Sequence, residues 1–384
     1  MKKQVFRAFA LAMTLALLVT TMLGSVTVAA APIPDTTSPS ALTVTTKPTY
    51  PAITRQVWDN HTDSWATTTS THFGGDIVHR VTSIVPNMAG HGSYIFTFHE
   101  RLAPAMTMDF DSIVVRVGGV QVSRGFHYTL NILPAGNGIP FNIAFSPAIF
   151  VGFTPGDIIE ITYSGTITGA AAVGAPGNIS ETVLEFSDNS LDVSSTARTA
   201  PATTNVFTFR FEVYKYTGVL GDDDRPLADA EFQLRTDPSD PATTISFARP
   251  DGGSNTRPAV YSHVLPIASN ARTTLLTPES GRLLISGLDV GVYYLIETKA
   301  PDGFNILEHP VQIEITHPNG DGESVVTADG NAILHRRVNV LNNAGTNLPG
   351  TGGIGRTIFN ITGLTMMFGA VALLLWQRKR TVAQ

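Results

Sequence analysis

The chain has 384 residues, of which 43% are hydrophobic and only 15% are charged, and it contains no cysteine. The length allows two domains of ordinary size, and the lack of cysteine excludes disulfide bonds, thiolate metal sites and cysteine nucleophiles. Residues 31–351 carry 18 of the 25 basic residues and all 31 acidic residues, a net charge of −13. Such an acidic surface is unsuited to phosphate contacts, so we exclude nucleic-acid binding.

The first 30 residues have the three parts of a secretory signal peptide: a basic start, an apolar run and a small-residue cleavage site. These parts are Lys2, Lys3 and Arg7, then residues 8–23, then residues 28–30. We therefore expect residues 1–30 to be removed on export. Residues 31–50 are rich in Pro, Thr and Ser and are expected to form an exposed leader.

Residues 51–189 consist of short runs in which apolar and polar residues alternate, separated by Gly, Pro and Asn turn residues. This pattern is typical of antiparallel strands, and we find no sustained 3.6-residue periodicity in it. Residues 190–205 are rich in Ser, Thr and Ala and are expected to be a linker. A second segment with strand patterns covers residues 206–343. The sequence therefore predicts an all-β protein with two tandem β-sandwich domains.

The second domain is expected to contain strands at 207–215, 231–235, 282–285, 291–297, 311–316 and 337–342, with insertions between strands in residues 236–277. Side chains alternate between the two faces of a strand. Three of these strands have an apolar face that ends in a polar residue, which is Lys215, Glu297 or Asn342. The domain therefore places an amine, a carboxyl group and a carboxamide beside apolar residues.

These three groups suffice for a spontaneous isopeptide bond. Burial disfavours the charged forms of both an amine and a carboxyl group. A neutral Lys215 amine can attack the side-chain carbonyl of Asn342 while protonated Glu297 stabilises the oxyanion and relays a proton to the leaving ammonia. Fixed reactants reach effective molarities of roughly 10⁵–10⁸ M, so no cofactor or oxidant is needed. A surface Lys–Glu pair beside an ordinary asparagine is the alternative.

Residues 211–316 resemble the prealbumin-like domain of Gram-positive pilins and adhesins, the SpaA-like or CnaB-like type. The matching motifs are PLADAEFQL at 226–234, ISGL at 285–288 and YYLIETKAPDGF at 293–304. The resemblance implies that Glu297 is the catalytic acid and that Lys215 and Asn342 are the crosslinked pair, with Asn343 as the fallback.

Residues 51–189 resemble the fimbrial isopeptide-forming domain of pilin backbone subunits. The matching stretches are 75–82, 84–86, 96–102, 161–164 and 177–187. The resemblance places Arg55 where the family has its lysine, Glu100 at the acid, and Asn178 near the asparagine. An arginine stays protonated and is no nucleophile, so we expect a degenerate site without a bond, in which Arg55 and Glu100 could form a buried ion pair.

The end of the chain combines a pentapeptide, an apolar run at 357–377 and a basic tail at 378–380. The apolar run is just long enough to cross a bilayer, and the basic tail would stay cytoplasmic. The pentapeptide consists of Leu348, Pro349, Gly350, Thr351 and Gly352. Residues 348–384 thus resemble the cell-wall sorting signal of Gram-positive surface proteins. The resemblance implies a sortase that cleaves after Thr351 and joins it to an amine, so the membrane would hold the chain only transiently. A tail-anchored protein is the alternative.

The sequence contains no serine-hydrolase elbow and no His-rich metal motif, so we expect no enzyme beyond the autocatalytic crosslink, and no metal or cofactor. We expect a secreted fimbrial subunit, anchored in the cell wall, whose partners are sortase and either peptidoglycan or neighbouring subunits. Lys47 is the candidate pilus-linking lysine, with Lys299 as the second choice, although the Tyr-Pro-Lys motif of backbone pilins is absent. A wall-anchored adhesin for a host or bacterial surface ligand is the alternative.

Overall fold

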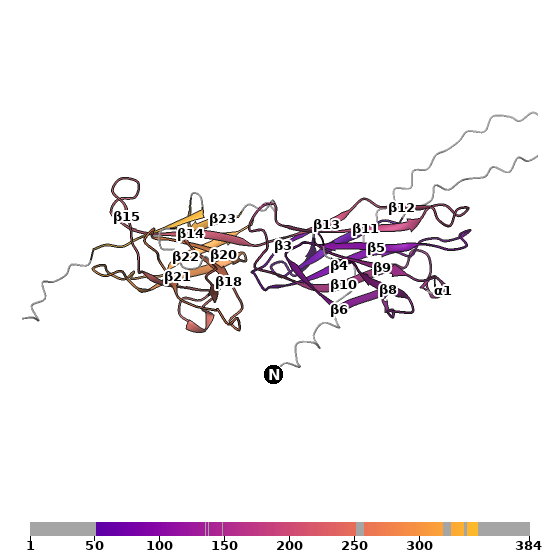
Figure 1. Ribbon diagram of the computed structural model, residues 1–384, viewed down its shortest axis with the longest axis horizontal. Coiled ribbons are helices and arrows are strands. Elements are labelled where there is room, and N and C mark those ends of the chain that lie inside the picture. The colour runs from indigo at the N-terminus through magenta and orange to yellow at the C-terminus, as the bar shows by residue number, and fades with distance from the viewer. Residues whose placement is uncertain are drawn as a thin grey trace, which may run out of the picture. The chain divides into compact units, whose positions relative to one another are not determined.

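The computed structural model describes residues 51–344, apart from positions 135, 137 and 148 and the segments 251–256, 318–323 and 334–335. These residues form two β-sandwiches, as predicted (Figure 1). The α-helix in this part of the chain, α1, is the single turn Ile149–Gly152. No helix among the described residues is long and apolar enough to span a membrane, and the predicted helix at 357–377 lies outside them.

The first sandwich is built from two sheets of short strands. Six strands each supply one residue to the buried Arg55 cluster described below: β1 (Thr54–Asp59), β4 (Asp76–Ile84), β5 (Phe96–Leu102), β10 (Ile158–Ile167), β11 (Asn178–Ser187) and β13 (Ala202–Phe207). The others are β2 (Ser64–Ala66), β3 (Thr68–Ser70), β6 (Met106–Val117), β7 (Val120–Gln121), β8 (Tyr128–Ile132), β9 (Ile139–Phe145) and β12 (Thr196–Arg198). One sheet has the order β2-β1-β4-β10-β6-β7, and the other has β3-β13-β11-β5-β9-β8 with β12 beside β11.

Alternating burial explains why these residues make a sandwich. Along β10, every second residue from Ile159 to Ile167 is buried, and β11 shows the same alternation. Because successive side chains of a strand point to opposite faces, each sheet presents one apolar face, and the two faces share a core that contains Phe98, Phe141 and Ile161. Burial of apolar surface contributes roughly 25 cal/mol per Å² and drives the two faces together.

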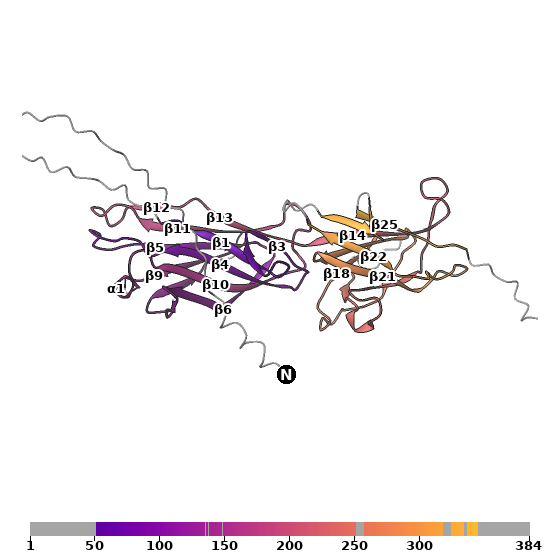
Figure 2. The ribbon, with the colours of Figure 1, turned by 180° about the vertical axis from the view of Figure 1, so that it is seen from behind.

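The second sandwich also consists of two sheets around its own core. Its first sheet contains β14 (Phe209–Thr217), β15 (Arg225–Pro226), β17 (Phe247–Ala248), β18 (Ala259–His263), β20 (Arg282–Leu288) and β25 (Arg337–Leu341). Its second sheet contains β16 (Glu231–Arg235), β19 (Leu275–Leu276), β21 (Gly291–Lys299), β22 (Val311–Thr316), β23 (Val325–Ala328) and β24 (Asn331–Ala332). The strand order of the first sheet is β15-β14-β20-β18-β17, with β25 beside β14, and that of the second sheet is β19-β16-β21-β22-β23-β24. In Figure 2, β25 runs beside β14, to which it pairs in parallel.

Two sequence expectations differ from this fold. The segment 190–205, expected to be a linker, contains β12 and most of β13, and β13 pairs with β11 and β3 of the first sandwich. Its Thr and Val residues suit a strand even though its overall composition is that of a loop. The segment 236–277, expected to hold insertions, contributes β17, β18 and β19 to the two sheets of the second sandwich.

Candidate functional site

Three strands of the second sandwich bring Lys215, Glu297 and Asn342 together in its core. Lys215 lies near the end of β14, and its register partner on β25 is Val340. Asn342 follows β25, where its backbone N–H donates to the carbonyl of Tyr216 at 2.8 Å. Glu297 lies on β21 of the opposite sheet. Because these side chains share the apolar faces of their strands, all three are buried, with at most 5% exposure.

The contacts between the three groups are direct. Lys215 Nζ lies 2.5 Å from Asn342 Oδ1 and 2.9 Å from Glu297 Oε1. Asn342 Nδ2 donates to the same Glu297 Oε1 at 3.3 Å. The attacking amine, the amide nitrogen that must leave, and one carboxyl oxygen are therefore mutual neighbours, which is the arrangement that a proton relay needs.

The surroundings of Lys215 increase the fraction of its nucleophilic, neutral form. Its side chain is fully buried, and Nζ lies 5.3 Å from the ring centroid of Phe232. Burial lowers the pKa of the Lys215 amine, and the hydrogen bond and charge of Glu297 oppose this shift only in part. A lowered pKa raises the fraction of neutral amine, which is the form that can attack a carbonyl.

Backbone contacts that the sequence did not reveal fix the site. Glu297 Oε2 accepts a hydrogen bond of 2.8 Å from the backbone N–H of Leu307, which leaves Oε1 to face the two nitrogens. The Lys215 backbone N–H donates to the carbonyl of Gly281 at 2.7 Å. Backbone donors and acceptors carry no signature in the sequence, because every residue except proline has both.

The geometry refines the expected role of Glu297. We expected its carboxyl group to contact the carbonyl oxygen of Asn342, but Oε1 faces the amide nitrogen Nδ2 instead. The arrangement suits proton transfer to the leaving nitrogen, whereas the carbonyl oxygen receives its hydrogen bond from Lys215 Nζ. The fallback Asn343 is exposed, and its backbone carbonyl accepts from Asn305 at 3.2 Å.

The first sandwich also buries a cation and a carboxylate in its core. The guanidinium of Arg55 on β1 donates from Nη1 to Glu100 Oε2 of β5, and both side chains have 0% exposure. Nη1 also donates to Tyr163 Oη at 2.8 Å and to Thr182 Oγ1 at 2.7 Å. These two hydroxyl groups in turn donate to Glu100, at 2.7 Å from Tyr163 and 2.9 Å from Thr182. Two neutral hydroxyl groups therefore bridge the charged pair.

Two further residues complete the Arg55 cluster. Nε of Arg55 donates to Thr204 Oγ1 at 3.1 Å, and Nη2 lies 3.3 Å from Nδ1 of His79. Burial opposes the charge of Arg55, but Tyr163 and Glu100 outweigh it and raise the pKa of the guanidinium. Arg55 therefore remains a cation and cannot act as a nucleophile.

Asn178 does not join the Arg55 cluster. Its Oδ1 accepts from the backbone N–H of Ala172, and its Nδ2 donates to the carbonyls of Ala172 and Val206, each at 3.0 Å. The position nearest to Arg55 and Glu100 on the same strand is Thr182 instead. The structure thus brings together two of the three residues expected for the degenerate site. Lys47 and residues 348–352 lie outside the described part of the chain.

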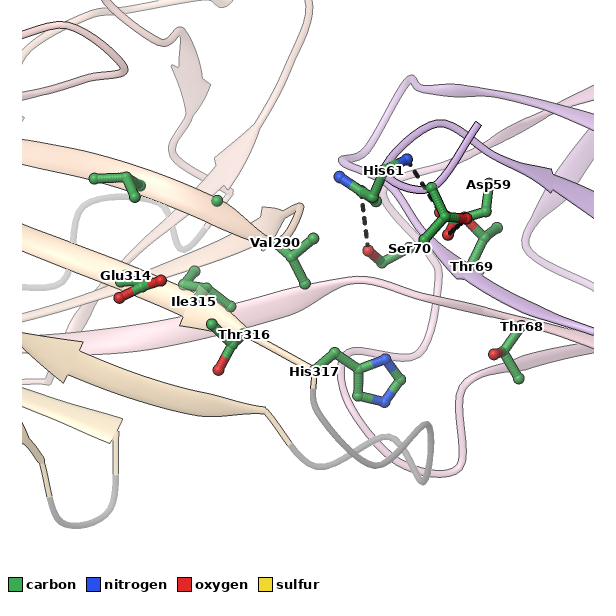
Figure 3. Close-up of a pocket in the computed structure, with 13 residues that line it drawn as sticks. Asp59, His61, Thr68, Thr69, Ser70, Val290, Glu314, Ile315, Thr316 and His317 are labelled. Atoms are coloured by element: carbon green, nitrogen blue, oxygen red, sulfur yellow. Dashed lines mark hydrogen bonds between the residues drawn. The ribbon is translucent and has the colours of Figure 1, made fainter. Parts of the chain in front are cut away.

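A polar hollow of about 520 Å³ is a further candidate ligand site (Figure 3). Its walls include Asp59, His61 and Ser70, and also Glu314. The oxygens of Asp59 already accept hydrogen bonds from Thr62 and Thr69, and Ser70 lies 3.5 Å from His61. Among the described residues there is no group of three or more metal-ligating side chains.

Comparisons with known proteins agree with this architecture. Residues 214–330 match the family model of SpaA, described as a prealbumin-like fold domain. Among curated proteins, none matches the chain in sequence. The 35 kDa C-terminal fragment of the major pilin GBS80 of Streptococcus agalactiae has a TM-score of 0.55 and 17% identity, with 77% of this chain and all of that chain covered.

Two other solved structures are similar at lower scores. BcpA, the major pilin subunit of Bacillus cereus, has a TM-score of 0.49 and 15% identity over 77% of this chain and 71% of that chain. The pilus backbone RrgB of Streptococcus pneumoniae has a TM-score of 0.49 and 14% identity, with 77% of this chain and 100% of that chain covered. Most of the second sandwich thus matches the SpaA prealbumin-like domain, in a chain that shares the fold of the GBS80 pilin fragment.

Proposed function

We propose that the chain is a structural subunit of a Gram-positive fimbrium whose second sandwich is stiffened by an isopeptide bond between Lys215 and Asn342. The observation that carries this proposal is the buried contact of Lys215 Nζ with both Asn342 and Glu297. The similarity to a fragment that is itself described as a major pilin supports the role in a fibre.

The proposed reaction needs only these three side chains. Glu297 Oε1 takes a proton from the Lys215 ammonium, and the neutral amine attacks the side-chain carbonyl carbon of Asn342. The protonated carboxyl group then donates to Nδ2 as the carbon–nitrogen bond breaks, and the new amide nitrogen returns a proton to the carboxylate. One ammonia leaves, one amide bond forms, and Glu297 ends in its acid form.

The bond would change how the second sandwich carries load. It joins β14, the first strand of this sandwich, to the residue that follows β25, its last. A force applied between the start and the end of the sandwich then acts on a covalent link, whereas an uncrosslinked pair of parallel strands would rely on its hydrogen bonds. In a fimbrial subunit that is pulled at both ends, such a link would keep the second sandwich from unfolding under load.

Sortase attachment at Thr351 is the second part of the proposal, and it rests on the pentapeptide with its apolar run and basic tail. We expect the mature chain to begin near Ala31 and to end at Thr351. Substitution of Leu348 or Thr351 should release the protein from its covalent linkage to the wall. Linkage that survives both substitutions would contradict this part.

Polymerisation needs an accessible lysine outside the crosslink, and the expected mature chain offers Lys47 and Lys299. Lys299 is 60% exposed and lies 3.7 Å from Glu231. We propose Lys47 as the acceptor, because the sequence places it in the expected leader, ahead of the first sandwich. An antibody against the protein should detect high-mass ladders in cell-wall extracts, and these should vanish in a Lys47→Arg strain. A single wall-linked species in the unmodified strain would favour the adhesin instead.

A further inference from the structure

His79 is a buried titratable residue that the crosslink does not use. It lies on β4 and is fully buried, and its ring stacks on Tyr163 with the centroids 5.1 Å apart. Its register partners are Val57 on β1 and Tyr163 on β10. The imidazole therefore lies on the strand between β1 and β10, on the inner face of the first sandwich.

The hydrogen bonds of His79 fix its neutral form. Arg55 Nη2 lies 3.3 Å from Nδ1, and a guanidinium group can only donate, so Nδ1 must be the acceptor. The proton of the neutral ring then lies on Nε2, which has no hydrogen-bond partner among the described residues. A second proton would have to enter at Nδ1, where it would face the N–H groups of Arg55.

The charged and titratable groups around His79 leave no acceptor for a second cation. Arg55 of β1 and Tyr163 of β10 contact it directly, and Glu100 of β5 is reached through these two. Glu100 already accepts from Arg55, Tyr163 and Thr182. Burial, and then the charge of Arg55, hold the pKa of His79 well below its usual value of 6.5.

We propose that the first sandwich is an acid-labile element, in which proton uptake by His79 favours opening of β4 together with its neighbours β1 and β10. An exposed imidazole binds a proton at about pH 6.5, whereas the buried ring does not. The closed form is therefore fully favoured above this pH and loses stability as the pH falls below it. The opening equilibrium should rise by up to about tenfold per pH unit below 6.5.

A second, partly buried histidine makes a whole-protein measurement ambiguous. Burial, and then His72, lower the pKa of His263 on β18 to about 4, so the second sandwich contains a similar group. The test must therefore follow individual strands and compare variants of His79. Hydrogen exchange with peptide-level mass spectrometry on the expected mature chain, residues 31–351, meets both needs.

Protection factors of peptides from β1, β4 and β10 should fall by up to roughly 30-fold between pH 7.5 and pH 5.0, of which about 16-fold falls below pH 6.5. His79→Gln keeps an acceptor for Arg55 but cannot titrate, so most of this fall should vanish in that variant. His91→Gln, in the same sandwich but with a half-buried ring outside the cluster, should behave as the unmodified protein does.

An equal fall in the unmodified protein and in His79→Gln, or protection that does not change, would overturn the proposal. If His79→Gln does not fold at neutral pH, the imidazole signals of the unmodified protein decide by NMR. A His79 ring that stays neutral at pH 5 while the sandwich is closed supports the proposal, and a titration near pH 6.5 in the closed form refutes it.

Discussion

The two sandwiches bury the same kind of ion pair, but the two pairs differ in the chemistry that they permit. Arg55 with Glu100 in the first and Lys215 with Glu297 in the second are both pairs with 0% side-chain exposure. The lysine can lose its proton in such a site and become a nucleophile, whereas the arginine cannot. The comparison teaches that burial of a cation beside a carboxylate permits a crosslink only if the cation is an amine.

The third partner separates the two sites further. Lys215 faces the carboxamide of Asn342, which offers a carbonyl carbon and a leaving nitrogen. Arg55 faces the hydroxyl groups of Tyr163 and Thr182, which offer hydrogen bonds alone. The second sandwich is therefore equipped for a covalent bond, and the first is held by a hydrogen-bonded charge cluster.

Removal of the crosslink should give the largest effect on stability. The bond would close a loop of more than 100 residues, and a link of that span stabilises a fold by about 5 kcal/mol in the chain-entropy account. Asn342→Ala should lower the free energy of unfolding of the second sandwich by about this amount in denaturant titrations. Asn343→Ala, at the exposed neighbouring position, is the matched control and should change it by less than about 0.5 kcal/mol. Equal stability of both variants would contradict the crosslink.

Disruption of the Arg55 cluster in the first sandwich should give the next largest loss of stability. Glu100→Gln leaves the Arg55 charge buried without a carboxylate, which costs roughly 3–5 kcal/mol. The control is Glu181→Gln, which breaks the exposed pair of Glu181 with Arg101 at 2.8 Å and should cost less than about 1 kcal/mol. Thermal unfolding of the first sandwich measures both variants. A loss of stability of similar size in the two variants would show that the buried pair contributes no more than the exposed one.

Conversion of the first site into the second sharpens the comparison. Arg55→Lys alone should form no bond, because Asn178 is engaged by the backbone of Ala172 and Val206. Combined with Thr182→Asn, the new lysine would face a carboxamide next to Glu100. The double variant should lose a further ammonia, about 17 Da in intact mass, as expected for fixed reactants. A folded double variant that shows no further loss of mass beyond that of the unmodified protein would mean that the new reactants are not aligned.

The smallest effect is expected at the surface of the second sandwich. Lys299 and Glu231 form an exposed pair at 3.7 Å, and such pairs contribute about 0–1 kcal/mol. Glu231→Gln should therefore leave the thermal midpoint nearly unchanged. A loss comparable to that of Asn342→Ala would mean that the surface pair, and not the buried site, dominates the stability of this sandwich.

Strand periodicity predicted much of the second site. Alternation alone turned Lys215, Glu297 and Asn342 toward the core, and the structure buries all three. The same logic could not find Leu307, which acts through its backbone N–H, or the place of Thr182, since a threonine on an alternating strand looks like any other. His79 was missed because a single histidine on a strand does not reveal which charge it will face.

The linker was misplaced for a related reason. Residues 190–205 have the composition of a loop, but β13 pairs with β11 and β3, which both lie outside this segment, and β3 is more than 100 residues earlier in the chain. Composition reports on local preference, whereas a strand is stabilised by the neighbours that it pairs with. Boundaries between domains are therefore less predictable than the inward faces of long strands.

Intact mass tests the central claim most directly. The chain of residues 31–351, purified in its folded form, should weigh about 17 Da less than its sequence requires, which corresponds to one lost ammonia and to one bond. Lys215→Ala, Asn342→Ala and Glu297→Ala should each restore the full mass, the first two by removing a reactant and the third by removing the proton relay. A folded, unmodified chain with the full mass of its sequence would contradict the crosslink and the mechanical role built on it.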